Sequence, residues 1–89
     1  MNRYEEFDMA MLDLRDALRR AGLPHLAAKV PVEPVRTMDD FLGAQVALGT
    51  VYTLVRLRPP PPTAYNTFMK HILRVDQIVA VIERFDRSS

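Results

Sequence analysis

The spacing of hydrophobic and polar positions predicts a long helix at the start of the chain. Gly22 follows this segment and offers the left-handed conformation that ends many helices. We therefore predict a helix over residues 3–21. Five apolar residues recur at spacings of three and four, which places them on one helical face: Tyr4, Phe7, Met11, Leu14 and Leu18.

Two further helices are predicted after a proline-containing connector. Thr37, with Asp40 three residues later, is typical of a helix start, and a long apolar stretch follows. This predicts a helix over residues 38–57. Thr63 is the candidate cap of a third helix, over residues 64–86. Its apolar seam contains Tyr65, Phe68, Ile72, Val75, Val79 and Ile82.

Two segments have less decisive patterns. Residues 50–58, TVYTLVRLR, are rich in β-branched residues and are also compatible with a strand. We favour a helix, because the only plausible partner strand, 30–36, contains Pro31 and Pro34. Pro24 suits the first turn of a short helix near residues 24–29. The predicted fold is an all-α bundle of three main helices, in a single domain over residues 1–89.

The stretch RLRPPPP, residues 56–62, has two interpretations. Arg56, Pro59 and Pro62 have the i, i+3, i+6 spacing of polyproline ligands. The stretch also lies between two apolar helices, where prolines end one helix and stiffen the joint to the next. We favour the structural joint and leave open whether another protein binds the stretch.

Composition indicates a small globular protein. The chain has 89 residues, of which 48% are hydrophobic, and a formal net charge of +1. This charge is too small to indicate a polyanionic partner. No run of about 18 apolar residues is present, and the N-terminal residues lack the apolar core of a secretory signal. We expect a cytoplasmic protein without a membrane segment.

Basic residues near the end of the first predicted helix suggest one alternative function. The segment from 14 to 30 faintly resembles a helix-turn-helix with Gly22 in the turn. Pro31 would break its second helix early, and Asp13 and Asp16 dilute the positive charge. A dimeric nucleic-acid-binding regulator is therefore the second hypothesis. It would use Arg15, Arg19, Arg20 and Lys29.

Residues suited to metal binding or catalysis are sparse. The chain has no cysteine, and its two histidines, His25 and His71, have no metal-ligand spacing to acidic residues. Asp39 and Asp40 are explained by their place in the first turn of a helix, where the dipole favours anions. We expect no metal, no cofactor and no enzymatic activity.

The strongest signal is an excess of apolar helix surface. The second predicted helix is apolar nearly all round, and the third widens its apolar seam in its second half. We therefore expect a protein-protein interaction module, such as an adaptor, inhibitor, chaperone or antitoxin-like regulator. It would form a homodimer or an obligate complex with another protein. The residues predicted for the interface are Leu54, Val55, Ile78, Val81 and Phe85.

Overall fold

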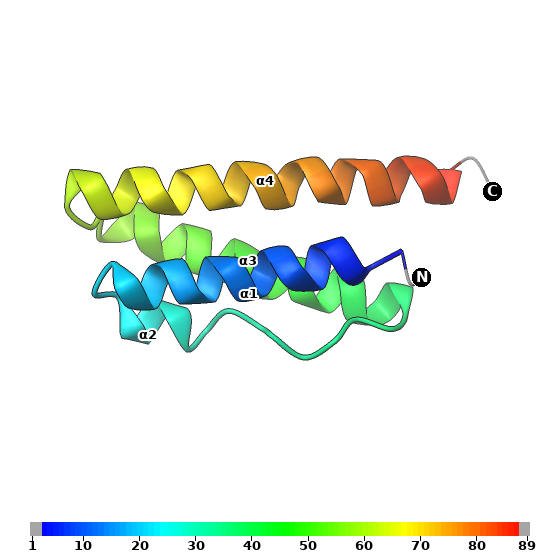
Figure 1. The fold of residues 1–89 in the computed structure, drawn as a ribbon, viewed down its shortest axis with the longest axis horizontal. Helices are drawn as coiled ribbons and strands as arrows, with labels where there is room; N and C mark the ends of the chain where they lie inside the picture. The colour runs from blue at the N-terminus through cyan, green and yellow to red at the C-terminus, as the bar shows by residue number, and fades with distance from the viewer. Residues whose placement is uncertain (1–2, 88–89) are drawn as a thin grey trace.

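The computed structural model describes the backbone of residues 3–87 and the side chains of residues 3–85. Within that range the chain forms four helices and no strand (Figure 1). The all-α prediction is therefore confirmed, and residues 50–57 are helical rather than extended. The short helix expected near 24–29 is present as a single turn. The helices are α1 (Glu5–Arg20), α2 (Pro24–Ala27), α3 (Met38–Leu57) and α4 (Pro62–Arg87).

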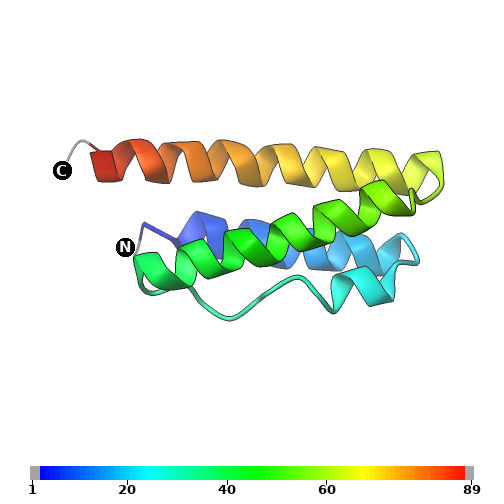
Figure 2. The same ribbon diagram turned by 180° about the vertical axis from the view of Figure 1, so that it is seen from behind.

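The three long helices form an antiparallel pair crossed by a third helix. α1 and α4 lie side by side and run in opposite directions along a molecule that measures 42 × 20 × 19 Å (Figure 1). α3 lies behind this pair and crosses it obliquely (Figure 2). The end of α3 lies beside the start of α4, whereas the start of α3 lies farther from α4. α3 and α4 therefore diverge from the proline loop that joins them.

The core lies where the three long helices face one another, and its centre is aromatic. Phe7, Phe41 and Phe68 are fully buried. The ring centroid of Phe41 lies 5.0 Å from that of Phe7 and 5.4 Å from that of Tyr4, which connects α1 to the start of α3. Tyr52 and Phe68, at 6.3 Å, connect α3 to α4. Each buried ring stabilises the fold by roughly 1.5–3 kcal/mol before entropy is subtracted.

Gly22 ends α1 as predicted. It has a φ of 78°, in the left-handed region. Its backbone N–H donates to the Arg19 carbonyl at 3.1 Å, and the Leu23 N–H donates to the Leu18 carbonyl at 2.9 Å. These two bonds make a Schellman motif, which satisfies carbonyls that the end of α1 would otherwise leave unpaired. The chain then reverses direction and enters α2 at Pro24.

The predicted start of α3 is confirmed, whereas the predicted start of α4 is wrong. Thr37 caps α3: its Oγ1 accepts from the Asp40 N–H at 3.1 Å, and the Asp40 carboxylate accepts from the Arg36 N–H at 3.2 Å. α4 begins at Pro62, one residue before Thr63, so Thr63 lies inside the first turn and is not the cap. Proline suits that first position because its missing N–H would have no intrahelical partner there.

The connector between α2 and α3 completes one side of the core. Val30 and Val35 are buried although they lie outside the helices. The Val35 N–H donates to the Asp8 carboxylate at 3.0 Å, which fixes the connector to α1. Part of the apolar surface left by the three main helices is therefore covered by the chain itself. The large apolar side chains left exposed lie on all three long helices: Met9 and Leu12 on α1, Leu42, Val46 and Leu57 on α3, and Leu73, Val81 and Phe85 on α4.

Candidate functional site

The five residues predicted for the interface do not form one surface. Val55 is 1% exposed and belongs to the core, while Leu54 and Ile78 are half-buried. Val81 and Phe85 are 60% and 64% exposed. They lie in the last two turns of α4, whereas Leu54 lies beside its start, about 28 Å away along the helix. The five-residue surface is therefore wrong as a unit, because it combines a core residue with side chains at opposite ends of the molecule.

The outward side of α3 is an exposed surface with few polar groups. Residues 41–55 contain no charged side chain. Leu42 and Leu57 are largely exposed on this helix, and Val46 is 73% exposed. A helix face in water normally carries charged residues opposite its buried stripe. This α3 face therefore has the composition of a contact surface rather than of a solvated one.

The glycines of α3 are not explained by packing within the chain. An added Cβ at Gly43 or Gly49 would have no atom within 4 Å, and both residues have ordinary helical φ angles. No part of the described chain therefore approaches either glycine closely. Each glycine costs the helix about 1 kcal/mol relative to alanine. Because Gly49 has no side chain, it widens a groove between α3 and α4.

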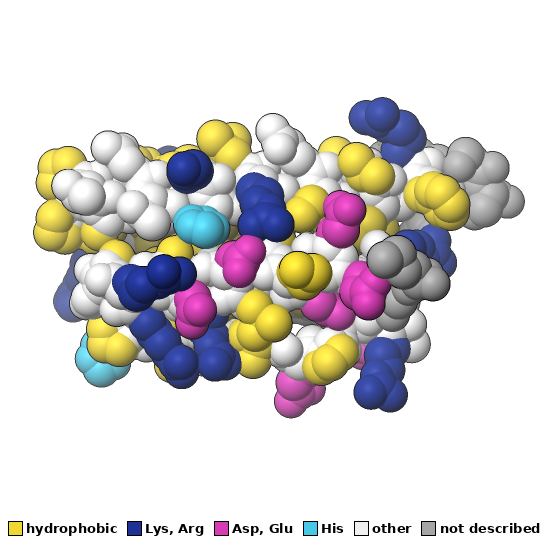
Figure 3. Space-filling model, in the orientation of Figure 1, with side chains coloured by type: hydrophobic (Ala, Val, Ile, Leu, Met, Phe, Trp, Pro, Cys, Tyr) yellow, Lys and Arg dark blue, Asp and Glu magenta, His cyan; other side chains and the backbone are white. Residues whose placement is uncertain are grey.

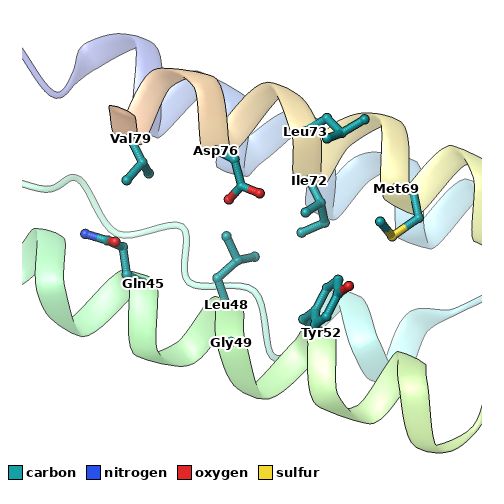
Figure 4. A pocket seen from close by; sticks show the side chains of 9 residues that line it. All are labelled: Gln45, Leu48, Gly49, Tyr52, Met69, Ile72, Leu73, Asp76 and Val79. Atoms are coloured by element: carbon teal, nitrogen blue, oxygen red, sulfur yellow. The ribbon is translucent and has the colours of Figure 1, made fainter. Parts of the chain in front are cut away.

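That groove separates α3 from α4 and has a volume of about 460 Å³. We call it the α3–α4 groove (Figure 4). It opens where the oblique course of α3 carries it away from α4. From α3 it is lined by Gln45, Leu48, Gly49 and Tyr52. From α4 it is lined by Met69, Ile72, Leu73, Asp76 and Val79.

Two polar groups stand out in the α3–α4 groove. The Asp76 carboxylate points from α4 into the groove toward Leu48, and the Gln45 amide lies near Val79 (Figure 4). Gln45 Nε2 is buried without a hydrogen-bond partner among the described residues. No described residue forms an ion pair or hydrogen bond with the Asp76 carboxylate either. The sequence did not single out this pair, although it marked the helix that carries Gln45 as apolar nearly all round.

The basic residues of the alternative hypothesis lie in the second half of α1 and just after α2. Arg19, Arg20 and Lys29 are exposed, and Arg15 is half-buried. Figure 3 shows acidic side chains interspersed with basic ones over α1 and the adjoining side of α4. α2 has four residues, too few for a helix that enters a DNA groove. The helix-turn-helix interpretation of residues 14–30 is therefore wrong.

A second hollow, of about 530 Å³, lies between the end of α1 and the start of α4. Arg20, Thr63, Thr67 and His71 contribute its polar groups. Partial burial lowers the pKa of His71 below its ordinary value of 6.5, and nearby arginine and lysine side chains add to the effect. Asp13 opposes it, but its carboxylate is 2.8 Å from the Arg74 guanidinium. The imidazole is therefore held toward its neutral form.

The proline run has the geometry of a joint. Arg56 and Leu57 belong to α3, and Pro62 already belongs to α4, so only residues 58–61 lie between the helices. A polyproline II ligand with the predicted spacing would need all of residues 56–62 extended. The Arg56 guanidinium lies 5.9 Å from the centroid of the Tyr52 ring, on the same helix. In this conformation the RLRPPPP stretch is not a polyproline ligand.

Among the side chains of residues 3–85, no group of three or more from histidine, cysteine, aspartate and glutamate is placed to hold a metal ion. None of the helices in the same range has an apolar stretch long enough to cross a bilayer. No family model matches the chain, and no significant similarity links it to a curated protein or to a solved structure. Its function is therefore argued from its own surface.

Proposed function

We propose that the chain is a non-enzymatic protein-protein interaction module. It binds another polypeptide, a second copy or a different protein, through the apolar surface that α3 and α4 share. One observation supports this most directly: the exposed side of α3 carries Leu42 and Val46 but no charged residue over 41–55. Exposed apolar surfaces of a few hundred Å² are typical of association sites.

The α3–α4 groove continues this surface. Leu73, 57% exposed, stands on the α4 side of the groove, and Gly49 lowers the α3 side. Leu73, Leu42 and Val46 lie outside the buried core, to which the connector contributes Val30 and Val35. The exposed apolar groups are therefore available for a partner rather than required for folding.

The test is photo-crosslinking in the cell from which the sequence comes. A benzophenone amino acid replaces Val46 in one variant and Leu73 in another, and it replaces the exposed Asp16 of α1 in a matched control. We expect discrete adducts from the first two positions and none from the control. An adduct of about twice the 10.2 kDa chain mass would identify a second copy. No adduct from either position, or the same diffuse adducts from all three, would contradict the proposed function.

A further inference from the structure

We propose that the α3–α4 groove binds an amphipathic helix of a different protein, and that this helix carries a lysine or arginine opposite Asp76. The inference rests on the proposed function, because it names the class of partner for the same surface. Four features of the groove support this inference: its helical walls, its length, its charge and the amide of Gln45 that has no hydrogen-bond partner.

The walls of the groove determine the backbone of the partner. Both walls are helices, whose N–H and C=O groups are already bonded within α3 and α4. They offer no sheet edge to which an extended peptide could add a strand. A segment buried between them must satisfy its own backbone, because unpaired N–H and C=O groups are costly when they leave water. An α-helix meets that requirement.

The length of the groove fits the anchor spacing of one helix. Its α4 wall runs from Met69 to Val79, about 15 Å along the axis. Anchors at i, i+3 or i+4, and i+7 span about 10 Å. Leu48 from α3 and Ile72 from α4 line the groove and supply the apolar contacts that such anchors need. A third helix there would complete a bundle around two helices that diverge.

The charge of the groove selects a basic residue. Asp76 is the one ionisable side chain among the residues that line it, apart from the tyrosine hydroxyl of Tyr52. Glu83 stands seven residues later on α4 but is followed directly by Arg84, so the charge of the groove comes from Asp76. Desolvating Asp76 under a purely apolar partner would be costly, whereas a lysine or arginine compensates for the lost water. The partner helix therefore carries a cation at this level.

The amide of Gln45 adds a second requirement. Its buried Nε2 has no acceptor among the described residues, and it lies near Val79, about one helical turn along α4 from Asp76. A partner residue with an oxygen acceptor would satisfy it. We therefore expect the basic residue and the acceptor, such as Gln, Asn or Ser, to stand three or four positions apart on the partner.

A second copy of the chain fits the groove less well. A two-fold interface that brings the α3–α4 grooves of two copies together is lined by the same residues from both subunits. Asp76 of one copy would then face an acidic groove rather than a basic one, and the lining supplies no cation to compensate. Like charges that meet in an interface oppose association. This favours a different protein as the occupant.

The experiment selects binders from a displayed library of 18-residue helical peptides randomised at the positions of one face. The full chain is the target, and Gly49→Gln is the blocked control, because Gly49 lines the groove and a Cβ there would meet no atom within 4 Å, so the longer side chain adds bulk at this wall. We expect selected peptides to carry a lysine or arginine one turn from an oxygen acceptor. Anisotropy titrations then compare the best peptide with its Lys→Glu analogue, which should bind about tenfold more weakly.

Variants of the chain show whether Asp76 is responsible for the preference for a basic peptide. Asp76→Asn should remove most of the preference for the basic peptide, and Asp76→Lys should reverse it. Asp16→Asn, an exposed acid on α1, should leave the preference unchanged. Selected peptides without a basic residue, a preference unaffected by Asp76→Lys, or no enrichment over the Gly49→Gln target would overturn the inference. Circular dichroism of each variant confirms that the helices persist.

The two proposals can fail separately. Crosslinked adducts from Val46 combined with an unsuccessful peptide selection would leave the interaction module intact and remove the basic helix. A Leu73 adduct of two chains would show that a second copy occupies the groove, and would also overturn the basic-helix inference. If a small apolar molecule binds the groove without displacing the selected peptide, the peptide does not occupy the groove, and the basic-helix inference is overturned.

Discussion

Gly22 and Gly49 show how one residue type has opposite effects at two positions. Gly22 adopts a φ of 78°, which an L-residue with a Cβ adopts only with strain. Gly49 lies inside α3 with an ordinary φ, and a Cβ there would meet no atom within 4 Å. Glycine is therefore needed at the first position and is a cost at the second.

We predict that Gly22→Ala lowers the free energy of unfolding by about 1–2 kcal/mol. Gly49→Ala should raise it by about 0.5–1 kcal/mol, because alanine restricts the unfolded chain and favours the helix. Urea unfolding followed by circular dichroism measures both. The two variants are matched controls for each other, since each adds the same methyl group. Equal effects of the same sign would contradict this account of the two sites.

His71 provides a prediction about pH. Partial burial lowers the pKa of this imidazole from 6.5; the positive charges of Arg74, Lys70 and Arg20 lower it further, and Asp13 raises it. Just below pH 6.5, His71 therefore binds a proton more readily in the unfolded chain than in the folded chain. Stability should fall as the pH drops through about 6.5, and this loss should level off below the folded pKa.

The measurement is the urea midpoint at pH 7.5 and at pH 5.5. His71→Gln should show a smaller decrease between the two values than the wild type. His25→Gln, which changes an exposed residue of α2, should keep the wild-type decrease. If His71→Gln keeps that decrease as well, the imidazole is not responsible for it.

At the scale of elements, local chemistry was enough to predict most helix boundaries. Gly22 ends α1 and Thr37 begins α3, because each supplies a conformation or an oxygen that the helix end requires. The start of α4 was missed by two residues. Thr63 could serve as a cap or stand within the first turn, and the preceding prolines satisfy the first position equally well. Local sequence does not distinguish these two starts.

The helical state of residues 50–57 shows where intrinsic propensity is overridden. The β-branched residues there favour a strand, but Val51 and Val55 lie four positions apart and both enter the core from one face of α3. A strand would also place Val51 and Val55 on one face, but it would turn Leu48, which lies three residues before Val51 and is also in the core, to the opposite face. The capped start of α3 and its contacts with α1 and α4 therefore outweigh local preference.

For the molecule as a whole, the sequence predicted that some apolar surface would remain exposed. It did not predict where on the molecule that surface would lie. Counting apolar positions shows that α3 has too many for one buried stripe. Their division between core and surface depends on the angle at which α3 crosses α1 and α4, which helical periodicity does not contain. That angle buries Val55 and opens the α3–α4 groove. Asp76 and Gln45 were missed for the same reason, because they line this groove from two different helices.

The division between core and surface leads to a last prediction. Val55 and Val81 were both expected at an interface, yet Val55 is 1% exposed and Val81 60%. The double variant Val81→Lys, Phe85→Lys should keep its helical circular dichroism and a single urea transition. Val55→Lys should lose both, because the free-energy cost of an unpaired charge in the core exceeds the free energy of unfolding of a small domain. Loss of helicity in the double variant would mean that the end of α4 is held by contacts essential to the fold.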